Sequence, residues 1–536
     1  MITIHMILHA HLDPIWLWPW QAGLDEALAT CRSACDRLDN NPDAIFTQGE
    51  AWVYQQVEMH DPELFARIRG HVDAGRWEIT GGWWIQPDCN APGGVGFEKQ
   101  IACGKNYFLD RFGQFPEVAF NADSFGHAAT LPGYMAAAGQ KYYIMMRPQE
   151  HEMTLPSRLF RWRGYADSPE IATFRIARSY NASRIEEDHV RAAASDLPDG
   201  IQHTMCFGGI GDHGGGPSEA LIADIRDQAN AFEGLRLQFS SPSRFFAAVA
   251  ADLHRVPQVT GELQFHAIGC YTVHRPIKLG VKRGEQALEQ AETALRADPK
   301  PPANATSDLE EHWRTVAFMQ FHDTLGGTCL PSAYRQVDAH LGAVLAFADK
   351  AMHGSLRRQL TALPDDPRQR LVFFNASDQM FNDWVEAEPW MGMRGCPETF
   401  SLLDENDAPV PFQLLHPEAI VRMGWPGRIL LRLQAEPGQL RVLRINEQAS
   451  TSTMTTASTL EGGPGWAANS CLHADLSKGI RAEKLALQMP QLSLLDDCTD
   501  TWSHGISRYT GETHASACWN APATTSGMAR LAPRSS

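Results

Sequence analysis

Short apolar runs alternate with longer amphipathic stretches over the first half of the chain. Continuous apolar runs are typical of parallel strands buried on both faces, and they stand at residues 2–8, 44–49, 76–80, 118–122, 141–146 and 203–207. Between them, Leu64, Ile68 and Val72 form one apolar stripe along a helix that begins near Asp61. Strands that alternate with helices predict an α/β fold with a parallel sheet from residue 1 to about residue 260.

The strand pattern disappears between about residues 262 and 362. Apolar residues at helical spacing recur at 288–295 and at 309–316, and a third helix is expected from about 332 to 363. Three successive helices predict a small helical bundle.

The second of these helices carries both a start signal and a stop signal. Ser307, followed three residues later by Glu310, matches a capping box, and Gly326 and Gly327 would end the helix. His322 would then lie in the last turn, where the helix dipole favours a nearby cation.

From about residue 370 the pattern is that of β-strands, at 371–374, 428–433 and 440–445. It breaks after Asn446. Residues 449–459 are nearly all Ser, Thr and Ala and residues 513–536 show neither period, so we expect both stretches to be poorly ordered. Together the patterns predict an α/β domain at 1–261, a three-helix middle domain at 262–365 and a partial β-rich C-terminal domain at 366–536.

The composition favours a soluble, cytoplasmic protein. A net charge of −17 argues against nucleic-acid and anionic-membrane partners. No apolar stretch of about 18 residues could span a membrane, and the first residues lack the basic region and cleavage site of a secretory signal. The 11 cysteines form no CxxC pairs, which favours reduced thiols. The oligomeric state is left open, with a homo-oligomer as one alternative.

Polar residues with metal-binding or acid–base chemistry follow four of the predicted strands. His11 and Asp13 follow the first strand, and Asp123, Arg147 and Asp212 each follow a later one. Active sites of α/β barrels and open sheets lie at the carboxyl ends of the strands. Imidazole and carboxylate ligands without a thiol suit zinc; the alternative is that His11 and Asp13 only form a turn that ends the strand.

Residues 81–88 (GGWWIQPD) form a further candidate feature. Glycines beside exposed tryptophans would suit a sugar-binding cleft, whereas a packed aromatic corner would explain the same residues equally well. The sequence does not decide between the two.

Four motifs, taken in their order along the chain, resemble one known family. They are residues 9–16 (HAHLDPIW), 121–127 (NADSFGH), 211–217 (GDHGGGP) and 320–328 (QFHDTLGGT), and together they resemble the α-mannosidases of glycoside hydrolase family 38. Residues 261–266 (GELQFH) and 269–272 (GCYT) resemble the start of the middle domain of that family. The resemblance implies a seven-stranded β/α barrel, then a three-helix bundle and a β-sandwich.

The resemblance also implies a metal site and a reaction. One zinc ion per chain would be held by His11, Asp13, Asp123 and His322. Asp123 would also be the nucleophile of a retaining α-mannosidase, which hydrolyses terminal α-D-mannosides through a covalent glycosyl-aspartate. The substrate would be a mannose-containing oligosaccharide or a smaller mannoside.

The remaining site residues rest on position and chemistry together. A retaining glycosidase needs a second carboxyl group about 5 Å from the first as its general acid, and Asp212 is our candidate. Trp16 would stack on the sugar ring or pack in the core. Further substrate contacts are expected from Arg147, His213 and Asp323. The resemblance also implies that Arg147 positions the nucleophile, and Asp323 could orient a metal ligand.

The chain also departs from the resembling family. Family members usually run several hundred residues longer, so we hypothesise that the C-terminal sandwich is incomplete here, with residues 495–504 as one piece of it. A catalytically impaired, sugar-binding remnant is therefore one alternative function. A metal-dependent amidohydrolase or phosphoesterase is another, because His9-x-His11 after a first strand also begins those sites.

Overall fold

The computed structural model describes residues 1–389, 400–415, 428–447 and a series of short stretches between 461 and 517. The chain packs into two compact units. The first comprises residues 1–288, 303–349 and 499–508, and the second comprises residues 289–302, 350–498 and 509–536. These boundaries pass through two long helices, and the division into three domains expected above stays a prediction.

The first sheet of unit 1 is entirely parallel. Strands β1 (Ile2–His9), β2 (Phe46–Gln48), β3 (Trp77–Ile79) and β8 (His203–Gly208) follow the order β3-β2-β1-β8, and β9 (Leu235–Phe239) also pairs with β1. The strand β1 is the centre of this sheet, and Ile4 to His9 are buried, as expected for a strand with helices or side chains on both faces.

The second sheet of unit 1 is mixed. Its order is β10 (Gln258–Thr260), β6 (Leu159–Arg163), β7 (Ile171–Arg175), β5 (Tyr142–Met145) and β4 (Val118–Asn121). Strands β4, β5 and β7 are parallel, whereas β6 runs antiparallel to β7. One buried cluster contains Ile7 and Phe207 from the first sheet and Ile144 and Phe174 from the second, so the two sheets share a core.

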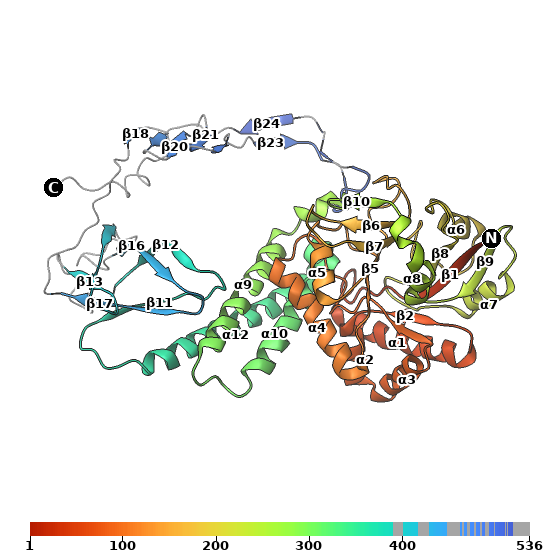
Figure 1. Ribbon diagram of the computed structural model, residues 1–536, viewed down its shortest axis with the longest axis horizontal. Coiled ribbons are helices and arrows are strands. Elements are labelled where there is room, and N and C mark those ends of the chain that lie inside the picture. Colours follow the sequence, from red (N-terminus) through yellow and green to blue (C-terminus); the bar gives the residue numbers. More distant parts are fainter. Residues whose placement is uncertain are drawn as a thin grey trace. The chain divides into compact units, whose positions relative to one another are not determined.

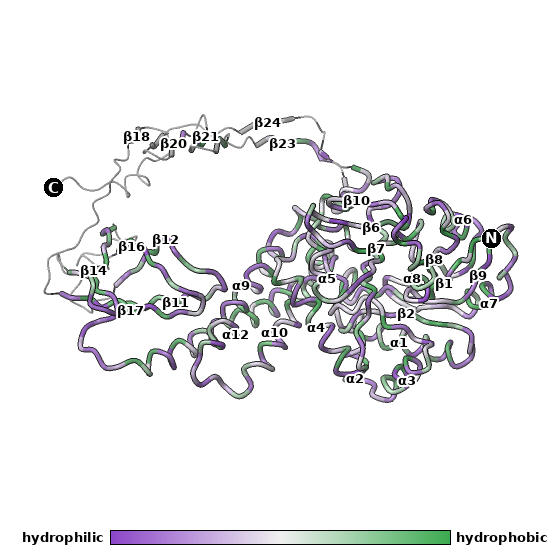
Figure 2. Tube along the Cα trace, in the orientation of Figure 1, coloured by the Kyte–Doolittle hydropathy of each residue, from purple (hydrophilic) through white to green (hydrophobic). Residues whose placement is uncertain are grey.

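Helices connect the strands of unit 1 (Figure 1). They are α1 (Trp20–Asn40), α2 (Ala51–His60), α3 (Pro62–Asp73), α4 (Gly94–Phe112), α5 (Leu131–Ala138), α6 (Glu187–Ala193), α7 (Glu219–Asp227), α8 (Pro242–Val249) and the 3-10 helix η1 (Ala250–Arg255). The helix expected near Asp61 is confirmed as α3, with the Asp61 carboxylate accepting from the Leu64 N–H at its start. Figure 2 shows the alternation of hydrophobic and hydrophilic stretches along these elements.

The helical middle region is confirmed. It contains η2 (Ile268–Tyr271), α9 (Arg275–Ala297), α10 (Ala305–Met319), α11 (His322–Gly326) and α12 (Pro331–Thr361). Small residues allow close packing within unit 1: a Cβ at Gly280 would lie 2.9 Å from the Leu341 side chain. The capping box is wrong, because Asn304 precedes the helix and the Ser307 hydroxyl donates back to the Asn304 carbonyl.

Unit 2 contains antiparallel sheets, as the β pattern predicts. One sheet has the order β11 (Arg370–Phe374), β17 (Leu440–Asn446), β13 (Ser401–Leu403), β14 (Pro409–Val410), and another has the order β12 (Phe381–Ala387), β16 (Arg428–Ala435), β15 (Phe412–Leu415). A buried cluster that includes Leu402, Phe412 and Leu431 takes residues from both sheets. This arrangement is sandwich-like.

Shorter strands follow in unit 2. Five form one sheet, namely β18 (Glu461–Gly463), β19 (Trp466–Ala468), β20 (Leu472–Asp475), β21 (Gly479–Ala482) and β22 (Leu485–Leu487), and β23 (Leu492–Leu495) pairs with β24 (Thr513–Ala517). Regular structure at 513–517 differs from the expectation for 513–536, because pairing with β23 supplies hydrogen bonds that no local pattern predicts. The expectation for 449–459, and for 518–536, lies outside the described residues.

The mixed α/β region, the helical middle and the later antiparallel sheets are therefore confirmed. The hydrogen bonds of unit 1 divide its strands between two sheets rather than joining them in one ring. The backbone N–H of Gly81, just after β3, nevertheless donates to the Val118 carbonyl of β4 at 2.8 Å. Among the described helices, none is long and apolar enough to cross a membrane.

Candidate active site

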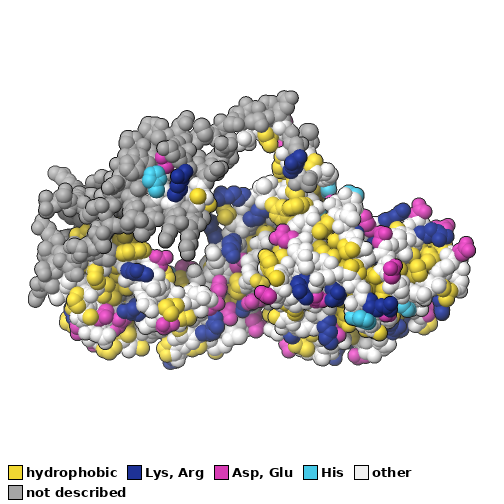
Figure 3. Space-filling view, turned by 45° about the horizontal axis from the view of Figure 1, so that its top comes forward, with side chains coloured by type: hydrophobic (Ala, Val, Ile, Leu, Met, Phe, Trp, Pro, Cys, Tyr) yellow, Lys and Arg dark blue, Asp and Glu magenta, His cyan; other side chains and the backbone are white. Residues whose placement is uncertain are grey.

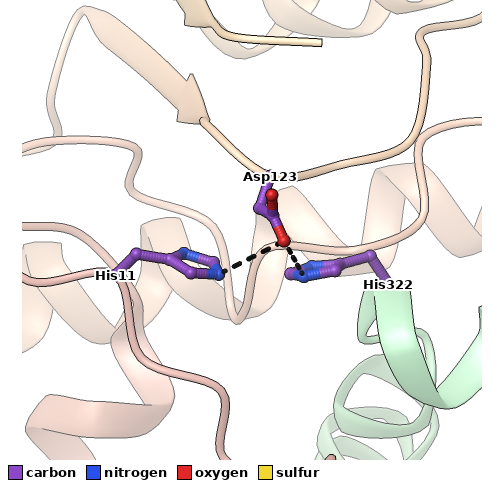
Figure 4. A group of neighbouring side chains, drawn as sticks. All are labelled: His11, Asp123 and His322. Carbon is purple, nitrogen blue, oxygen red and sulfur yellow. Dashed lines mark ion pairs between the residues drawn. The ribbon is translucent and has the colours of Figure 1, made fainter. Parts of the chain in front are cut away.

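Four side chains from distant parts of the sequence meet at the carboxyl ends of the strands. His11 and Asp13 follow β1, Asp123 follows β4, and His322 is the first residue of α11. The Nε2 atom of His322 lies 3.4 Å from Asp123 Oδ2 and 3.8 Å from Asp13 Oδ1. His11 Nε2 lies 2.9 Å from Asp13 Oδ1 and 4.0 Å from Asp123 Oδ2. Figure 4 shows the Asp123 carboxylate between the two imidazole rings.

The donor atoms of this cluster suit a divalent cation. His11 Nε2, His322 Nε2 and Asp13 Oδ1 are buried and find no partner in hydrogen-bond geometry among the described residues, although buried polar atoms are nearly always satisfied. Around a tetrahedral ion with bonds of about 2.0–2.1 Å, ligand atoms lie about 3.4 Å apart. Four of the six separations among these three atoms and Asp123 Oδ2, 2.9–4.0 Å, bracket that value. Three triads have ligand atoms within 4.8 Å of one another: His11–Asp123–His322, His11–Asp13–Asp212 and Asp13–His322–Asp323. The buried cluster could therefore hold a metal ion.

The charged groups of the cluster shift the pKa values of their neighbours. Burial alone would lower the pKa of His11, but Asp13 and Asp123 outweigh it and raise that pKa to about 10. Burial alone would raise the pKa of Asp123, but Arg147 and His322 hold it well below its ordinary value. Asp123 is therefore an ionised carboxylate at neutral pH.

His322 reaches the site in a different way from the one expected. Helix α10 ends at Met319, and His322 begins the separate helix α11, so the expected position in a last helical turn is wrong. The chain leaves the helix because residues 320–322 pair with residues 86–88: Asp88 N–H donates to the Gln320 carbonyl, and His322 N–H donates to the Gln86 carbonyl. His322 Nδ1 also donates to the Gln86 carbonyl at 2.9 Å, which leaves Nε2 for the cluster.

The neighbouring loop at 81–88 is a packed aromatic corner. Trp83 and Trp84 are 3% and 1% exposed, so the alternative of a sugar-binding cleft lined by exposed tryptophans is wrong. The loop serves the site through Gln86 instead. Its amide oxygen accepts from the Ala122 N–H, next to Asp123, and its amide nitrogen donates to the buried Glu50.

A cavity of about 220 Å³ opens beside the cluster. Sites for drug-sized ligands measure about 300–1,000 Å³, so this volume favours a small ligand or a single sugar residue. The lining residues are Asp13, Trp16, Asp123, Phe125, Arg147, Tyr180, Asp212, His266, Asp323, Trp502 and His504.

Asp212 is one of the residues that line the cavity. Its backbone φ of +59° is unusual for a residue with a side chain, and its carbonyl accepts from the Asp13 N–H at 2.9 Å. The Asp212 Oδ1 atom accepts from the Tyr180 hydroxyl at 2.9 Å and from the Asn181 amide at 3.3 Å. The backbone contact places this carboxyl group next to the metal-ligand strand.

The other expected site residues divide into two groups. Trp16, Arg147 and Asp323 line the cavity, and Asp323 is buried, with burial raising its pKa to about 7. His213 is exposed, lies 3.5 Å from the Glu26 carboxylate and contacts the Trp18 ring, and it is not among the cavity residues. The structure thus brings together all the expected residues except His213.

Several cavity residues carried no clear signal in the sequence. Tyr180 lies beyond β7, and His266 lies in the 261–266 motif that we assigned only to a domain boundary. Trp502 and His504 come from residues 499–508, more than 170 positions beyond His322. This segment packs on unit 1, with the Gly269 N–H donating to the Trp502 carbonyl at 3.1 Å.

A larger cavity, of about 450 Å³, lies elsewhere in unit 1. Trp77, Val118 and Tyr142, the first residues of β3, β4 and β5, line it. It is thus at the amino ends of these strands and contains none of the cluster residues. Chemistry rather than size identifies the smaller cavity as the candidate active site.

Comparisons with known protein families agree with the motifs. A model described as glycosyl hydrolases family 38 N-terminal domain matches residues 1–262. A model described as alpha mannosidase middle domain matches residues 264–358. The two models leave the later β-rich part of the chain unmatched.

Two known relatives are similar to this chain in sequence, and a solved structure is similar to it in fold. Human alpha-mannosidase 2C1 is 29% identical over 364 residues, which are 66% of this chain and 34% of that protein. Alpha-mannosidase G of Dictyostelium discoideum is 27% identical over 61% of this chain and 31% of its own length. The chain thus spans about a third of these relatives. The crystal structure of an alpha-mannosidase from Enterococcus faecalis V583 shares the fold, with a TM-score of 0.76, 15% identity and coverage of 94% of this chain and 63% of that one.

Proposed function

Because the chain belongs to glycoside hydrolase family 38, we propose that it is a retaining α-mannosidase that hydrolyses terminal α-D-mannosides. The observation that carries this proposal is the convergence of His11, Asp13, Asp123 and His322 beside a small cavity. We further propose that the strands of the two sheets, with their shared core, correspond to the expected seven-stranded barrel.

The resident cofactor in this proposal is one zinc ion. His11, Asp13, Asp123 and His322 would hold it, because their buried donor atoms are two imidazole nitrogens and two carboxylate groups. A zinc ion that expands its coordination beyond these four residues would supply Lewis acidity and a template for vicinal sugar hydroxyls. The axial 2-hydroxyl and equatorial 3-hydroxyl of mannose then give a stereochemical basis for selecting this sugar.

Two carboxyl groups of the chain supply the acid and nucleophile. Asp123 attacks the anomeric carbon, because Arg147 and His322 keep its carboxylate ionised. Asp212 protonates the leaving oxygen, and later takes a proton from the water that hydrolyses the glycosyl-aspartate. Among the described residues, the side-chain hydrogen bonds of Asp212 come from Tyr180 and Asn181 and go to Oδ1, and we propose Oδ2 as the atom that transfers this proton.

The cavity walls suit a pyranose ring. Trp16 offers an apolar ring surface for stacking on the sugar, and Asp323 offers a carboxyl group for its hydroxyls. On the face drawn in Figure 3, basic and acidic side chains of the described residues are interspersed, which is compatible with a neutral substrate.

We place the protein in the cytoplasm, in keeping with the seven unpaired, buried cysteines of the described part of the chain.

Metal analysis joined to a mannoside assay tests the proposal. We expect one zinc per chain and hydrolysis of 4-nitrophenyl α-D-mannoside with retained configuration. Asp123→Ala is expected to abolish hydrolysis, whereas Asp227→Ala, at an exposed position in α7, is expected to change nothing. Zinc and mannose binding without turnover in the wild type would instead favour the sugar-binding remnant. Turnover of aryl phosphates or amides but not mannosides would exclude the proposal.

A further inference from the structure

A buried histidine beyond the metal-ligand set contacts the arginine that holds Asp123. Arg147 donates from Nε to Asp123 Oδ1 at 2.7 Å, and its second terminal nitrogen lies 2.6 Å from the same oxygen. The remaining terminal nitrogen, Nη1, lies 2.9 Å from Nε2 of His266. His266 is 5% exposed and lines the cavity. The guanidinium therefore spans the space between the nucleophile and this histidine.

The hydrogen bonds of His266 define its tautomer. A guanidinium can only donate, so His266 Nε2 must accept. The ring proton is then on Nδ1, which lies 2.5 Å from Glu152 Oε1. Burial, together with the charge of Arg147, holds the pKa of His266 below its ordinary value despite Glu152, so the ring is neutral at pH 7.

Glu152 is itself fixed. Its second carboxylate oxygen accepts from the backbone N–H of Gln149 at 2.7 Å. Phe125 supports the group from another direction, with its ring 5.9 Å from the Arg147 guanidinium and 5.6 Å from the His266 ring. A continuous chain of hydrogen bonds thus leads from the Gln149 backbone through the side chains of Glu152, His266 and Arg147 to the carboxylate of Asp123.

We propose that Glu152 and His266 are positioning residues for the reaction of Asp123, which act by fixing the guanidinium of Arg147. This inference rests on the function proposed above. Arg147 binds Oδ1 of Asp123, so Oδ2 remains directed at His11 and His322. Without His266, the Nη1 group of Arg147 would lose its acceptor and could turn into the cavity. The plane of the Asp123 carboxylate would then be set less strictly, and a misplacement of about 1 Å can reduce a rate about 100-fold.

A structural role of the same residues makes different predictions. The Glu152–His266 pair joins the loop after β5 to the segment after β10, so its loss could lower stability alone. In that case the unfolding temperature would fall and kcat of the folded enzyme would not change. Positioning of the nucleophile instead predicts a fall in kcat with little change in KM, because the three guanidinium nitrogens of Arg147 contact Asp123 and His266.

Two variants of similar size separate these roles. His266→Gln keeps an acceptor for Arg147, whereas His266→Leu removes it. In the full-length, zinc-loaded protein we expect kcat for 4-nitrophenyl α-D-mannoside to fall about 10–100-fold in His266→Leu and less than about threefold in His266→Gln, with KM within about twofold in both. Equal kcat values in the two variants would overturn the inference.

A double-mutant cycle tests whether the two residues act as one unit. We expect Glu152→Ala combined with His266→Leu to be no slower than His266→Leu alone within about twofold, because residues in one hydrogen-bonded chain are not additive. Rate losses that multiply would contradict action through Arg147.

The tautomer supplies a readout that needs no activity. In ¹⁵N NMR spectra of histidine-labelled wild type, His266, assigned by comparison with His266→Gln, is expected to be neutral with its proton on Nδ1 at pH 7. A doubly protonated ring, or a proton on Nε2, would overturn the inference whatever the kcat values of the variants. If the zinc-loaded wild type does not hydrolyse mannosides, the proposed function fails, and the tautomer still decides whether the contact with Arg147 exists.

Discussion

Zinc should stabilise the first compact unit by an amount that the structure allows us to calculate. The cluster ligands come from residues 11–13, 123 and 322, so a bound ion would cross-link distant parts of the folded unit and would find no preformed site in the unfolded chain. At a free zinc concentration 100 times Kd, binding contributes about 2.7 kcal/mol. Unit 1 has roughly 350 residues, and unfolding entropy of about 2.1 cal/mol/K per residue then predicts a rise in Tm of about 4 °C.

The perturbation is His322→Gln. His322 is fully buried, and its Nε2 atom has no hydrogen-bond partner among the residues that the structure describes. The variant therefore removes a metal-ligand atom and leaves the outer surface unchanged. Loss of outer hydrogen bonds to a ligand already costs about 10–100-fold in metal affinity, and loss of a ligand should cost at least about 100-fold. At the same zinc concentration the gain then falls to about 0.4 kcal/mol, a shift of under 1 °C.

Thermal unfolding by calorimetry, with chelator-treated protein titrated with zinc, measures both shifts. His213→Gln is the matched control, because His213 is exposed and lies outside the cavity, and it should keep the shift of about 4 °C. An equal shift in wild type and His322→Gln would refute the reasoning, since the stabilising ion would then be bound elsewhere.

Three further predictions follow from the structure. Among the described residues, neither Oε2 of the buried Glu50 nor Nδ1 of the nearby His11 has a hydrogen-bond partner. Glu50→Gln should therefore weaken zinc affinity about tenfold in competition titrations with a chelator. A Cβ at Gly104 would lie 2.3 Å from the Gly82 carbonyl, so Gly104→Ala should lower the free energy of unfolding in urea by at least about 2 kcal/mol. A Cβ at Gly70 would meet open space, so Gly70→Ala should raise the same free energy by up to about 1 kcal/mol. Burial lowers the pKa of His5 from 6.5 to about 4, so its native form excludes a proton that the unfolded chain binds. Its contribution to stability is complete above pH 6.5 and is lost by up to about 1.4 kcal/mol per pH unit as the pH falls toward 4, and His5→Asn should flatten that part of the urea-unfolding profile.

Local pattern determined the elements of this protein and the order of its chemistry. Continuous apolar runs predicted β1, β4, β5 and β8 because a buried strand needs apolar residues on both faces. Parallel strands point their carboxyl ends in one direction, so the polar residues after β1, β4 and β8 could be grouped into one site before any contact was known. The residue types of these positions, imidazole and carboxylate, were sufficient to suggest zinc.

Long-range contacts decided the rest. Trp83 and Trp84 follow glycines, as exposed loop residues often do, but the packing of α4 and its neighbours buries them. The spacing of residues within a loop does not predict which part of the protein will cover that loop. His322 leaves its expected helix because residues 86–88 offer backbone hydrogen bonds from 230 positions away in the sequence. His213 is adjacent to Asp212 and yet points out of the cavity.

The sequence by itself therefore determined six strands of unit 1, β1 to β5 and β8, but not β6, β7, β9 and β10. It also determined which metal-binding and acid–base groups follow the predicted strands, because both depend on residue type and local spacing. Only the tertiary structure decided which of those groups share a cavity, and it added Tyr180, His266 and Trp502 to them. The physical reason is that burial and hydrogen bonding between distant segments depend on how the elements pack. The residue spacing within any one segment does not specify that packing.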